Sequence, residues 1–161
     1  MNELEIRTII ENTISDIKKT KKSVMTLENA EALANAVLAE AKRIGVKAVV
    51  CVSDSAGNPK LVKCMDDAYI ASYDVAVNKA FTVVALKMST IALKPLAQPG
   101  ASLYGIQFTN GGRIVIFGGG VVLKCGDRVI GALGVSGGTE EQDTLLAKLG
   151  GDLFKACIEN L

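Results

Sequence analysis

The chain contains no histidine, and this one absence removes much of the side-chain chemistry that enzymes use. Serine or cysteine triads, imidazole-ligated metals and imidazole acid–base catalysis all need that residue. Paired carboxylates are present at Asp66–Asp67 and Glu140–Glu141. Adjacent helical residues point in different directions, so neither pair is a natural acid–base dyad, and both pairs suit a helix start. We therefore predict that the protein is not an enzyme, and we assign no catalytic residue.

The cysteines Cys51, Cys64, Cys125 and Cys157 are the other residues capable of metal or redox chemistry. None belongs to a CxxC pair, and zinc would need thiolates collected from four separate elements. Each cysteine lies in an apolar stretch, which favours reduced, buried side chains. Cys51 and Cys64 flank one turn, so a redox pair there is the alternative. We assign no metal site.

Two glycine clusters are places where a ligand could approach the backbone. Gly137–Gly138 precedes a helix, as in an anion cradle, but three acidic residues follow where a phosphate would lie. Gly118–Gly120 has no acidic residue beside it. Because glycine lacks a Cβ, a flat ligand could lie against this segment. A bulge that turns one strand into the next is the alternative explanation of the three glycines.

Hydrophobic periodicity gives the elements that must position these residues. Helices are expected at 1–19, 27–44, from 66 or 67 to about 86, and at 139–161. Strands are expected at 46–53, 60–65, 114–117, 121–125 and 128–135. Tyr69 and Tyr73 are assigned to the inward stripe of the third helix, and residues 87–112 form a long loop of a kind that often carries function. The predicted fold is α+β: a five-stranded antiparallel sheet flanked by helices, plus an N-terminal amphipathic helix.

Composition limits the partners of the chain. The 161 residues are 49% hydrophobic and 22% charged, which indicates a globular protein with one main domain. A net charge of +1 and the absence of tryptophan argue against nucleic-acid binding. No apolar run approaches the roughly 20 residues of a membrane span, and the polar N-terminus does not look like a signal peptide. We therefore expect a cytoplasmic protein with no membrane or nucleic-acid partner.

The N-terminal stretch reads as a separate unit. Residues 1–23 are an amphipathic helix with an isoleucine stripe, Met1–Lys19, followed by a polar linker, and residues 24–161 form the main domain. One interpretation is an extra helix packed on its own domain. The other is a docking helix for a partner groove. The stretch resembles the encapsulation peptides that direct cargo into bacterial microcompartments, which implies shell or cargo proteins as partners.

From about Val24 onward the chain contains, in this order, the segments TLENAEALANAVLAEAKRIGV, VSDSAGNP, MDDAYIASYDVAVNKAFT, LYGIQ, FGGGVVL and IGALGVSGGTEEQD. In these segments and their order it resembles the GlcG/HbpS family, which includes the C-terminal domain of PduO proteins. Members form homo-oligomers, often octamers, around a five-stranded sheet, and several bind haem. PduO-type domains work in or beside microcompartments, which implies a location in the microcompartment lumen. The PduO adenosyltransferase domain is not expected here, so cobalamin adenosylation is not predicted.

The resemblance also implies a cofactor site. Its matching segments place Tyr104, Gln107 and Phe117–Gly120 (Phe117, Gly118, Gly119 and Gly120) as cofactor-binding residues. The PduO-type haem ligand is a histidine, and a histidine-ligated iron is excluded in this chain. The function implied is that of a non-catalytic, oligomeric microcompartment accessory protein that binds haem or a related tetrapyrrole without a histidine ligand. The alternative is a small-molecule-binding or structural component of the same pathway that binds no haem.

Overall fold

The computed structural model describes residues 3–18 and 24–159, and the predicted linker at Thr20–Ser23 lies outside them. The helices are α1 (Glu3–Lys18), α2 (Leu27–Arg43), α3 (Ile70–Leu86), α4 (Thr90–Leu93) and α5 (Glu140–Glu159). The strands are β1 (Val49–Asp54), β2 (Pro59–Cys64), β3 (Gly120–Cys125) and β4 (Arg128–Ser136). Three short 3₁₀ segments, Lys94–Ala97, Ile106–Phe108 and Asn110–Gly112, interrupt the predicted long loop.

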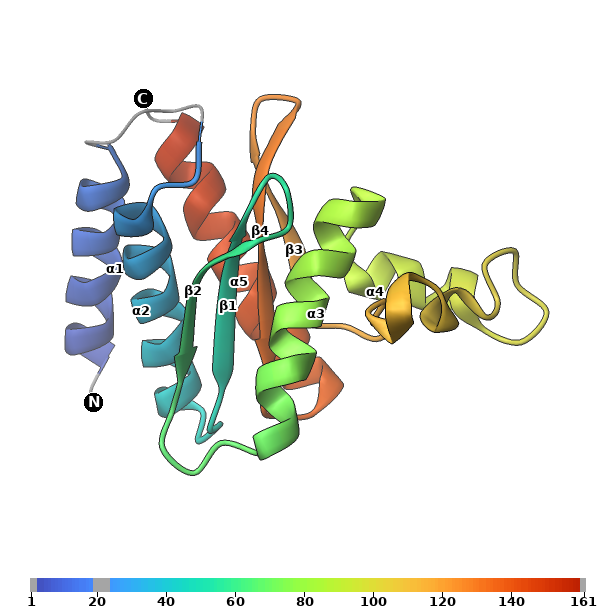
Figure 1. The fold of residues 1–161 in the computed structure, drawn as a ribbon. Helices are drawn as coiled ribbons and strands as arrows, with labels where there is room; N and C mark the ends of the chain where they lie inside the picture. Colours follow the sequence, from blue (N-terminus) through green and yellow to red (C-terminus); the bar gives the residue numbers. More distant parts are fainter. Residues whose placement is uncertain (1–2, 19–23, 160–161) are drawn as a thin grey trace.

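The sheet is antiparallel, with the strand order β2-β1-β4-β3 (Figure 1). Among the described residues it has four strands, so the prediction of a fifth strand at 114–117 is wrong. Only the first residue of that segment is fully buried, since Phe117 is 41% exposed, and its backbone bonds to α3 instead of pairing in the sheet. The Val115 N–H donates to Thr82 Oγ1 of α3 at 2.9 Å, where a strand would donate to a neighbouring backbone carbonyl. Ile114 is buried in the same place.

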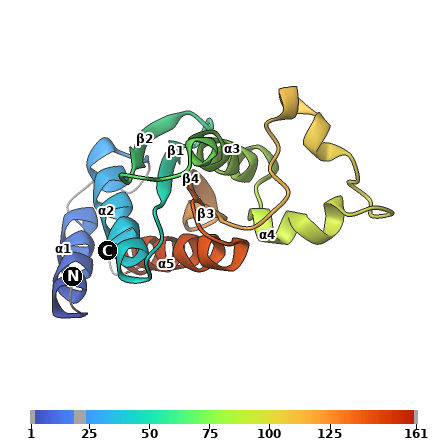
Figure 2. The ribbon, with the colours of Figure 1, turned by 90° about the horizontal axis from the view of Figure 1, so that it is seen from below.

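The helices cover both faces of the sheet (Figure 2). Because side chains alternate along a strand, Val50 and Val52 of β1 join the core formed with α2 and α5. Val49 and Cys51 point to the opposite face, where they pack with α3. The backbone of α3 comes very close to β4 at Gly134, where an added Cβ would lie 2.1 Å from the Ala76 carbonyl oxygen.

The first helix packs on its own domain. Helix α1 lies against α2 and α5 (Figures 1 and 2). Ile6 is buried, whereas Leu4 is 72% exposed. The structure therefore agrees with the interpretation of an extra packed helix. The resemblance to an encapsulation peptide stays a prediction.

Local signals explain most element ends. Thr26 begins α2 by accepting the Asn29 N–H at 3.1 Å, as a helix cap does. The third helix begins at Ile70 and not at residue 66 or 67, because Asp67 takes a left-handed conformation (φ 63°). The inward positions predicted for Tyr69 and Tyr73 are wrong: these side chains are 74% and 54% exposed.

Residues from α4 to about Gly112 project from the body of the molecule, and we call residues 98–112 the arm (Figure 2). Tyr104 and Phe108 on this arm are 62% and 81% exposed. Within the described residues, no single helix is long and apolar enough to cross a membrane; α3 and Thr90–Ala97 meet the criteria only jointly, as a pair bent by 72°.

Candidate functional site

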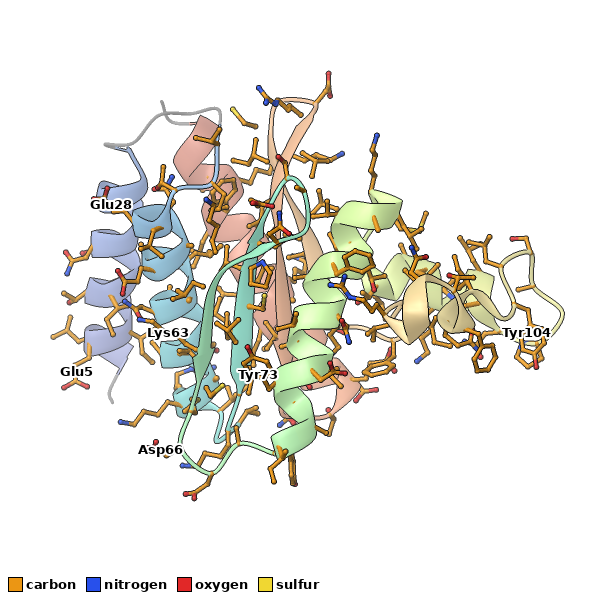
Figure 3. All side chains as sticks on the ribbon, viewed as in Figure 1. Glu5, Glu28, Lys63, Asp66, Tyr73 and Tyr104 are labelled. Atoms are coloured by element: carbon orange, nitrogen blue, oxygen red, sulfur yellow. The ribbon has the colours of Figure 1, made fainter. Side chains whose placement is uncertain are left out.

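The predicted cofactor-binding residues fall into two separate places. Tyr104 and Gln107 are on the arm, and Tyr104 lies far out along it (Figure 3). The segment Phe117–Gly120 lies in the body of the molecule, in contact with α3, α4 and α5. The described chain therefore does not form one site from these six residues.

The three glycines are buried and tightly enclosed. A Cβ added at Gly118 would lie 2.1 Å from Thr144 Oγ1, one at Gly119 would lie 2.5 Å from Lys79 Nζ, and one at Gly120 would lie 2.8 Å from Thr90 Cγ2. Packing within this chain therefore explains why glycine occupies all three positions. Ligand contact with these residues stays a prediction, and their burial within the described chain does not favour it.

The backbone of the glycine segment is also satisfied by the chain itself. Gly118 N–H donates to Glu140 Oε1 at 2.8 Å, and Gly120 N–H donates to Thr90 Oγ1 at 2.9 Å. The Gly119 carbonyl accepts the Val135 N–H at 2.8 Å. Glu140 also pairs with Lys94 of the Lys94–Ala97 segment. The N-terminus of α5 thus anchors the segment that leads into β3.

Beneath this segment is an ion pair that the sequence analysis missed. Lys79 Nζ of α3 lies 2.8 Å from Asp143 Oδ2 of α5 and donates to the Val135 carbonyl of β4 at 2.7 Å. The two side chains are 0% and 5% exposed. The only sequence signal is that a lysine stands three residues after Ala76, on the apolar stripe of α3. Its partner is 64 positions away, beyond the reach of local patterns.

Burial acts on both charges of this pair. Removal from water lowers the pKa of Lys79 and raises the pKa of Asp143, while their mutual attraction opposes both shifts. The Phe117 ring covers the ammonium, with its centroid 4.9 Å from Nζ. A lysine of lowered pKa can act as a nucleophile. Here the ammonium is enclosed and donates to two oxygens, so it joins α3, β4 and α5.

Two hollows lie along the outer face of α5. The larger, about 430 Å³, is bounded by β3 and α5, and the smaller, about 360 Å³, by α4, Lys94 and the first turns of α5. Lys148 lines both of them. Volumes of this size lie within the range of ligand pockets. Sequence periodicity could not find these hollows, because they form between elements that are distant along the chain.

The prediction of buried cysteines holds for Cys51 and is wrong for Cys64, which is exposed, while Cys125 is half-buried. Burial raises the pKa of the Cys51 thiol to about 12, which keeps it protonated. Cys51 lies opposite Val62 and Cys64 lies opposite Val49, so the two cysteines are not directly paired across β1 and β2. Over residues 3–18 and 24–159, no group of three His, Cys, Asp or Glu side chains could hold a metal ion.

Comparison with known proteins supplies the family. Residues 25–151 match the model described as "Haem degrading protein HbpS-like". The chain is 48% identical, over 85% of its length and 96% of the relative's, to a 15.0 kDa protein from the dhaT-dhaS intergenic region of Citrobacter freundii. A solved PduOC:heme complex is similar with a TM-score of 0.78 and 35% identity, over 81% of this chain and 94% of that one. The chain therefore belongs to the HbpS-like family.

A further relative is the corrinoid adenosyltransferase PduO of Salmonella typhimurium. It is 37% identical over 81% of this chain, but only 39% of PduO is matched. The chain thus resembles a minor part of that enzyme's length. The similarity confirms the resemblance to PduO that the sequence segments carry.

Proposed function

We propose that this protein is an accessory protein that binds haem or a closely related tetrapyrrole. The observation that carries the proposal is the solved PduOC:heme complex, whose chain aligns with this one over 94% of its length at 35% identity. The haem-related description of the matching family model adds support. The fold of those relatives is present here with its α+β layers and antiparallel sheet.

The residues of this chain set conditions on how a tetrapyrrole is held. With no histidine in the sequence, iron cannot be bound through imidazole. The ring needs an apolar surface, and its carboxylates need cations. The larger α5 hollow offers cations, because Lys124, Lys148 and Lys155 line it, while Phe154 of its lining is only 1% exposed. Lysine, tyrosine, cysteine and methionine are the other donor types that the chain could offer to the iron.

The experiment is a titration of the full chain with haemin, followed by absorbance in the Soret region. We expect the Soret absorbance to change and to saturate at stoichiometric haemin. Bovine serum albumin, titrated in parallel, should give a Soret spectrum of a different shape. Metal-free protoporphyrin, titrated in the same way, separates recognition of the ring from ligation of the iron. Absence of any saturable change with haemin would overturn the proposal.

We also propose that the protein holds the tetrapyrrole without converting it. The support is chemical: the chain lacks imidazole, and its most perturbed amine, Lys79, is fully enclosed. After haemin is bound, ascorbate is added and the Soret band is followed over hours. A band that declines no faster than free haemin is the expected result. A faster decline with a bilin-like product would identify a haem-degrading enzyme instead.

Self-association is a further part of the proposal. Large apolar side chains are exposed at the start of α3 and on the arm: Ile70 is 97% exposed, Phe108 is 81% exposed and Tyr69 is 74% exposed. Exposed apolar surface of this extent is typical of protein contacts. Light scattering on the purified chain should give a mass that is a multiple of 16.9 kDa. A monomer at micromolar concentration would contradict this part.

The proposed location is the lumen of a bacterial microcompartment, with α1 as the docking helix for shell or cargo proteins. The support is the amphipathic pattern of α1 and the similarity of the main domain to PduO. Residues 1–23 fused to a fluorescent protein should co-localise with assembled shells. Diffuse fluorescence would contradict targeting. A second candidate function, a pathway component that binds no haem, is favoured by the absence of histidine.

A further inference from the structure

The arm, residues 98–112, is a projecting segment in which no residue is buried. It contains no Asp, Glu, Lys or Arg, whereas 22% of the whole chain is charged, so about three charged residues would be expected in a surface segment of this length. The side chains of Tyr104 and Phe108 on the arm are more than half exposed. Exposed rings on an uncharged, protruding segment are typical of a surface that another protein covers.

The arm keeps its shape through its own hydrogen bonds. At its base, the Leu103 N–H donates to the Leu96 carbonyl at 2.8 Å. Further out, the Phe108 N–H donates to the Gly105 carbonyl at 3.0 Å. A segment that is already ordered loses little conformational entropy when it binds, so the arm is well prepared to form a contact.

A second uncovered apolar surface lies at the start of α3. We call Tyr69, Ile70 and Tyr73 the α3 patch, and all three side chains are more than half exposed. Ile70 and Tyr73 are three positions apart in the helix, so they are neighbours on one of its faces. Figure 3 shows Tyr104 far out along the arm, well away from Tyr73 on α3. Each copy of the chain therefore presents two separate apolar surfaces.

The charges beside the two surfaces have opposite signs. Residues 64–78, which include the α3 patch, contain three acidic residues and no basic one: Asp66, Asp67 and Asp74. Residues 87–113, which include the arm, contain three basic residues and no acidic one: Lys87, Lys94 and Arg113. Lys94 pairs with Glu140, but within the described part of the chain the three aspartates, Lys87 and Arg113 form no ion pair. Opposite charges of this kind bring two protein surfaces together in a fixed orientation.

The apolar surface beside the smaller hollow fits the arm less well. Ile91 and Leu145 line that hollow, and both are less exposed than Tyr69 or Ile70. The charges there are already paired, since Glu140 holds Lys94. This surface therefore offers no free acidic partner comparable to the three aspartates around the α3 patch.

We propose that the arm of one copy of this chain lies on the α3 patch of a second copy, with its two aromatic rings against the apolar side chains of the patch. The basic flanks of the arm then meet the aspartates of the other copy. Because each copy carries both surfaces, the exchange can be reciprocal, and a two-fold axis closes it. This contact, which rests on the proposed self-association, specifies the two surfaces that meet.

Complementation between two single variants tests the contact. F108E places a charge in the arm, and I70E places one in the α3 patch. Both positions are exposed, and glutamate suits the first turn of a helix, so both chains should fold. The matched control is L4E, at an exposed leucine of α1 outside both surfaces. Circular dichroism verifies the fold of each variant.

The readout is the dissociation constant of the assembly, measured by light scattering over a dilution series. We expect F108E and I70E each to raise it about tenfold or more, and L4E to change it by less than about twofold. An equimolar mixture of F108E and I70E should associate more tightly than either variant alone, because the intact arm of I70E meets the intact patch of F108E.

Photo-crosslinking locates the contact directly. The substitution Phe108→p-benzoylphenylalanine keeps an aromatic ring on the arm, and mixing isotope-labelled with unlabelled chains identifies links between copies. We expect links from position 108 of one copy to residues 66–74 of another. Should F108E or I70E fail to fold, this measurement decides.

The outcomes separate this contact from the proposed function. A wild-type chain that is monomeric at micromolar concentration would overturn the proposed self-association and the contact with it. A wild-type assembly that F108E and I70E leave unchanged would overturn the contact alone, as would links only to surfaces outside residues 66–74. A mixture no tighter than its two separate variants would also overturn it, because it would mean that arm meets arm or patch meets patch.

Discussion

The buried pair of Lys79 and Asp143 offers the sharpest test of how the interior is held together, through the substitution K79M. Methionine preserves most of the side-chain length but removes the charge and the donors. The Val135 carbonyl loses a hydrogen bond of 2.7 Å, and Asp143 keeps only bonds such as the one from Gly138 N–H at 3.0 Å. An unpaired buried carbonyl costs about 1–3 kcal/mol, and breaking a buried ion pair costs about 3–5 kcal/mol in total.

The pH dependence of this loss has a definite sign. Burial already raises the pKa of Asp143 above the ordinary 3.8 of an aspartate, and removing the lysine raises it further. In K79M the buried charge of Asp143 has no cationic partner. Protonation of Asp143, which removes this charge, therefore stabilises K79M more than it stabilises the wild type. The difference in unfolding free energy should be largest near neutral pH and should shrink as the pH falls toward 3.8.

Urea unfolding at pH 7 and pH 5, followed by circular dichroism, measures the difference. The matched control is K148M, which removes one member of the exposed Lys148–Asp152 pair and should cost less than about 0.5 kcal/mol. The reasoning is refuted if K79M is no less stable than K148M. It is also refuted if the deficit of K79M grows as the pH falls.

Three further substitutions test other parts of the structure. I6A in α1 should lower the free energy of unfolding in urea by about 2–4 kcal/mol, because Ile6 is only 6% exposed. L4A, at a position that is 72% exposed, should change this free energy little. Equal effects of the two substitutions would mean that α1 does not pack as described. G119A should lower the free energy of unfolding by about 2 kcal/mol or more, since its Cβ would lie 2.5 Å from Lys79 Nζ. The control G100A, at a glycine that also has a positive φ but has open space around it, should lower it by about 1 kcal/mol. E140Q should lower the free energy of unfolding by about 1 kcal/mol above pH 4.5. The difference from the wild type should vanish at lower pH, because the bond from Lys94 holds the pKa of Glu140 below 4.5 and protonation removes the charge. A difference that stays constant with pH would contradict this.

The parts of the fold that the sequence predicts are those set by local patterns. Examples in the structure are the cap at Thr26, the turn at Gly126 and the reciprocal hydrogen bonds of Thr139 and Gln142. Each depends on residues within three or four positions. Strand β1 has apolar residues on both of its faces, as expected of a central strand, and both faces are buried in the structure.

The wrong predictions share a physical cause. The run at 114–117 is apolar and β-branched, a composition that a strand shares with a partly buried segment outside the sheet. Its hydrogen bond to Thr82 depends on a contact between residues 33 positions apart. Tyr69 and Tyr73 fit a helical stripe by spacing, yet they lie outside the core because α3 turns Ala76 and Ala80 to the sheet.

The candidate site was the least accessible to sequence reasoning. The glycines at 118–120 are conspicuous in the sequence, but their purpose is visible only when Lys79, Thr90 and Thr144 are placed beside them. The hollow between β3 and α5 leaves no local pattern, because it forms where β3 meets a helix that begins 15 residues after β3 ends.

The most direct measurement of the central claim is a haemin titration of the folded wild-type chain beside bovine serum albumin. The account predicts a saturable Soret change for the wild type at stoichiometric haemin, with a spectrum that differs from that of the albumin sample. A wild-type chain whose spectrum does not change with haemin would contradict it.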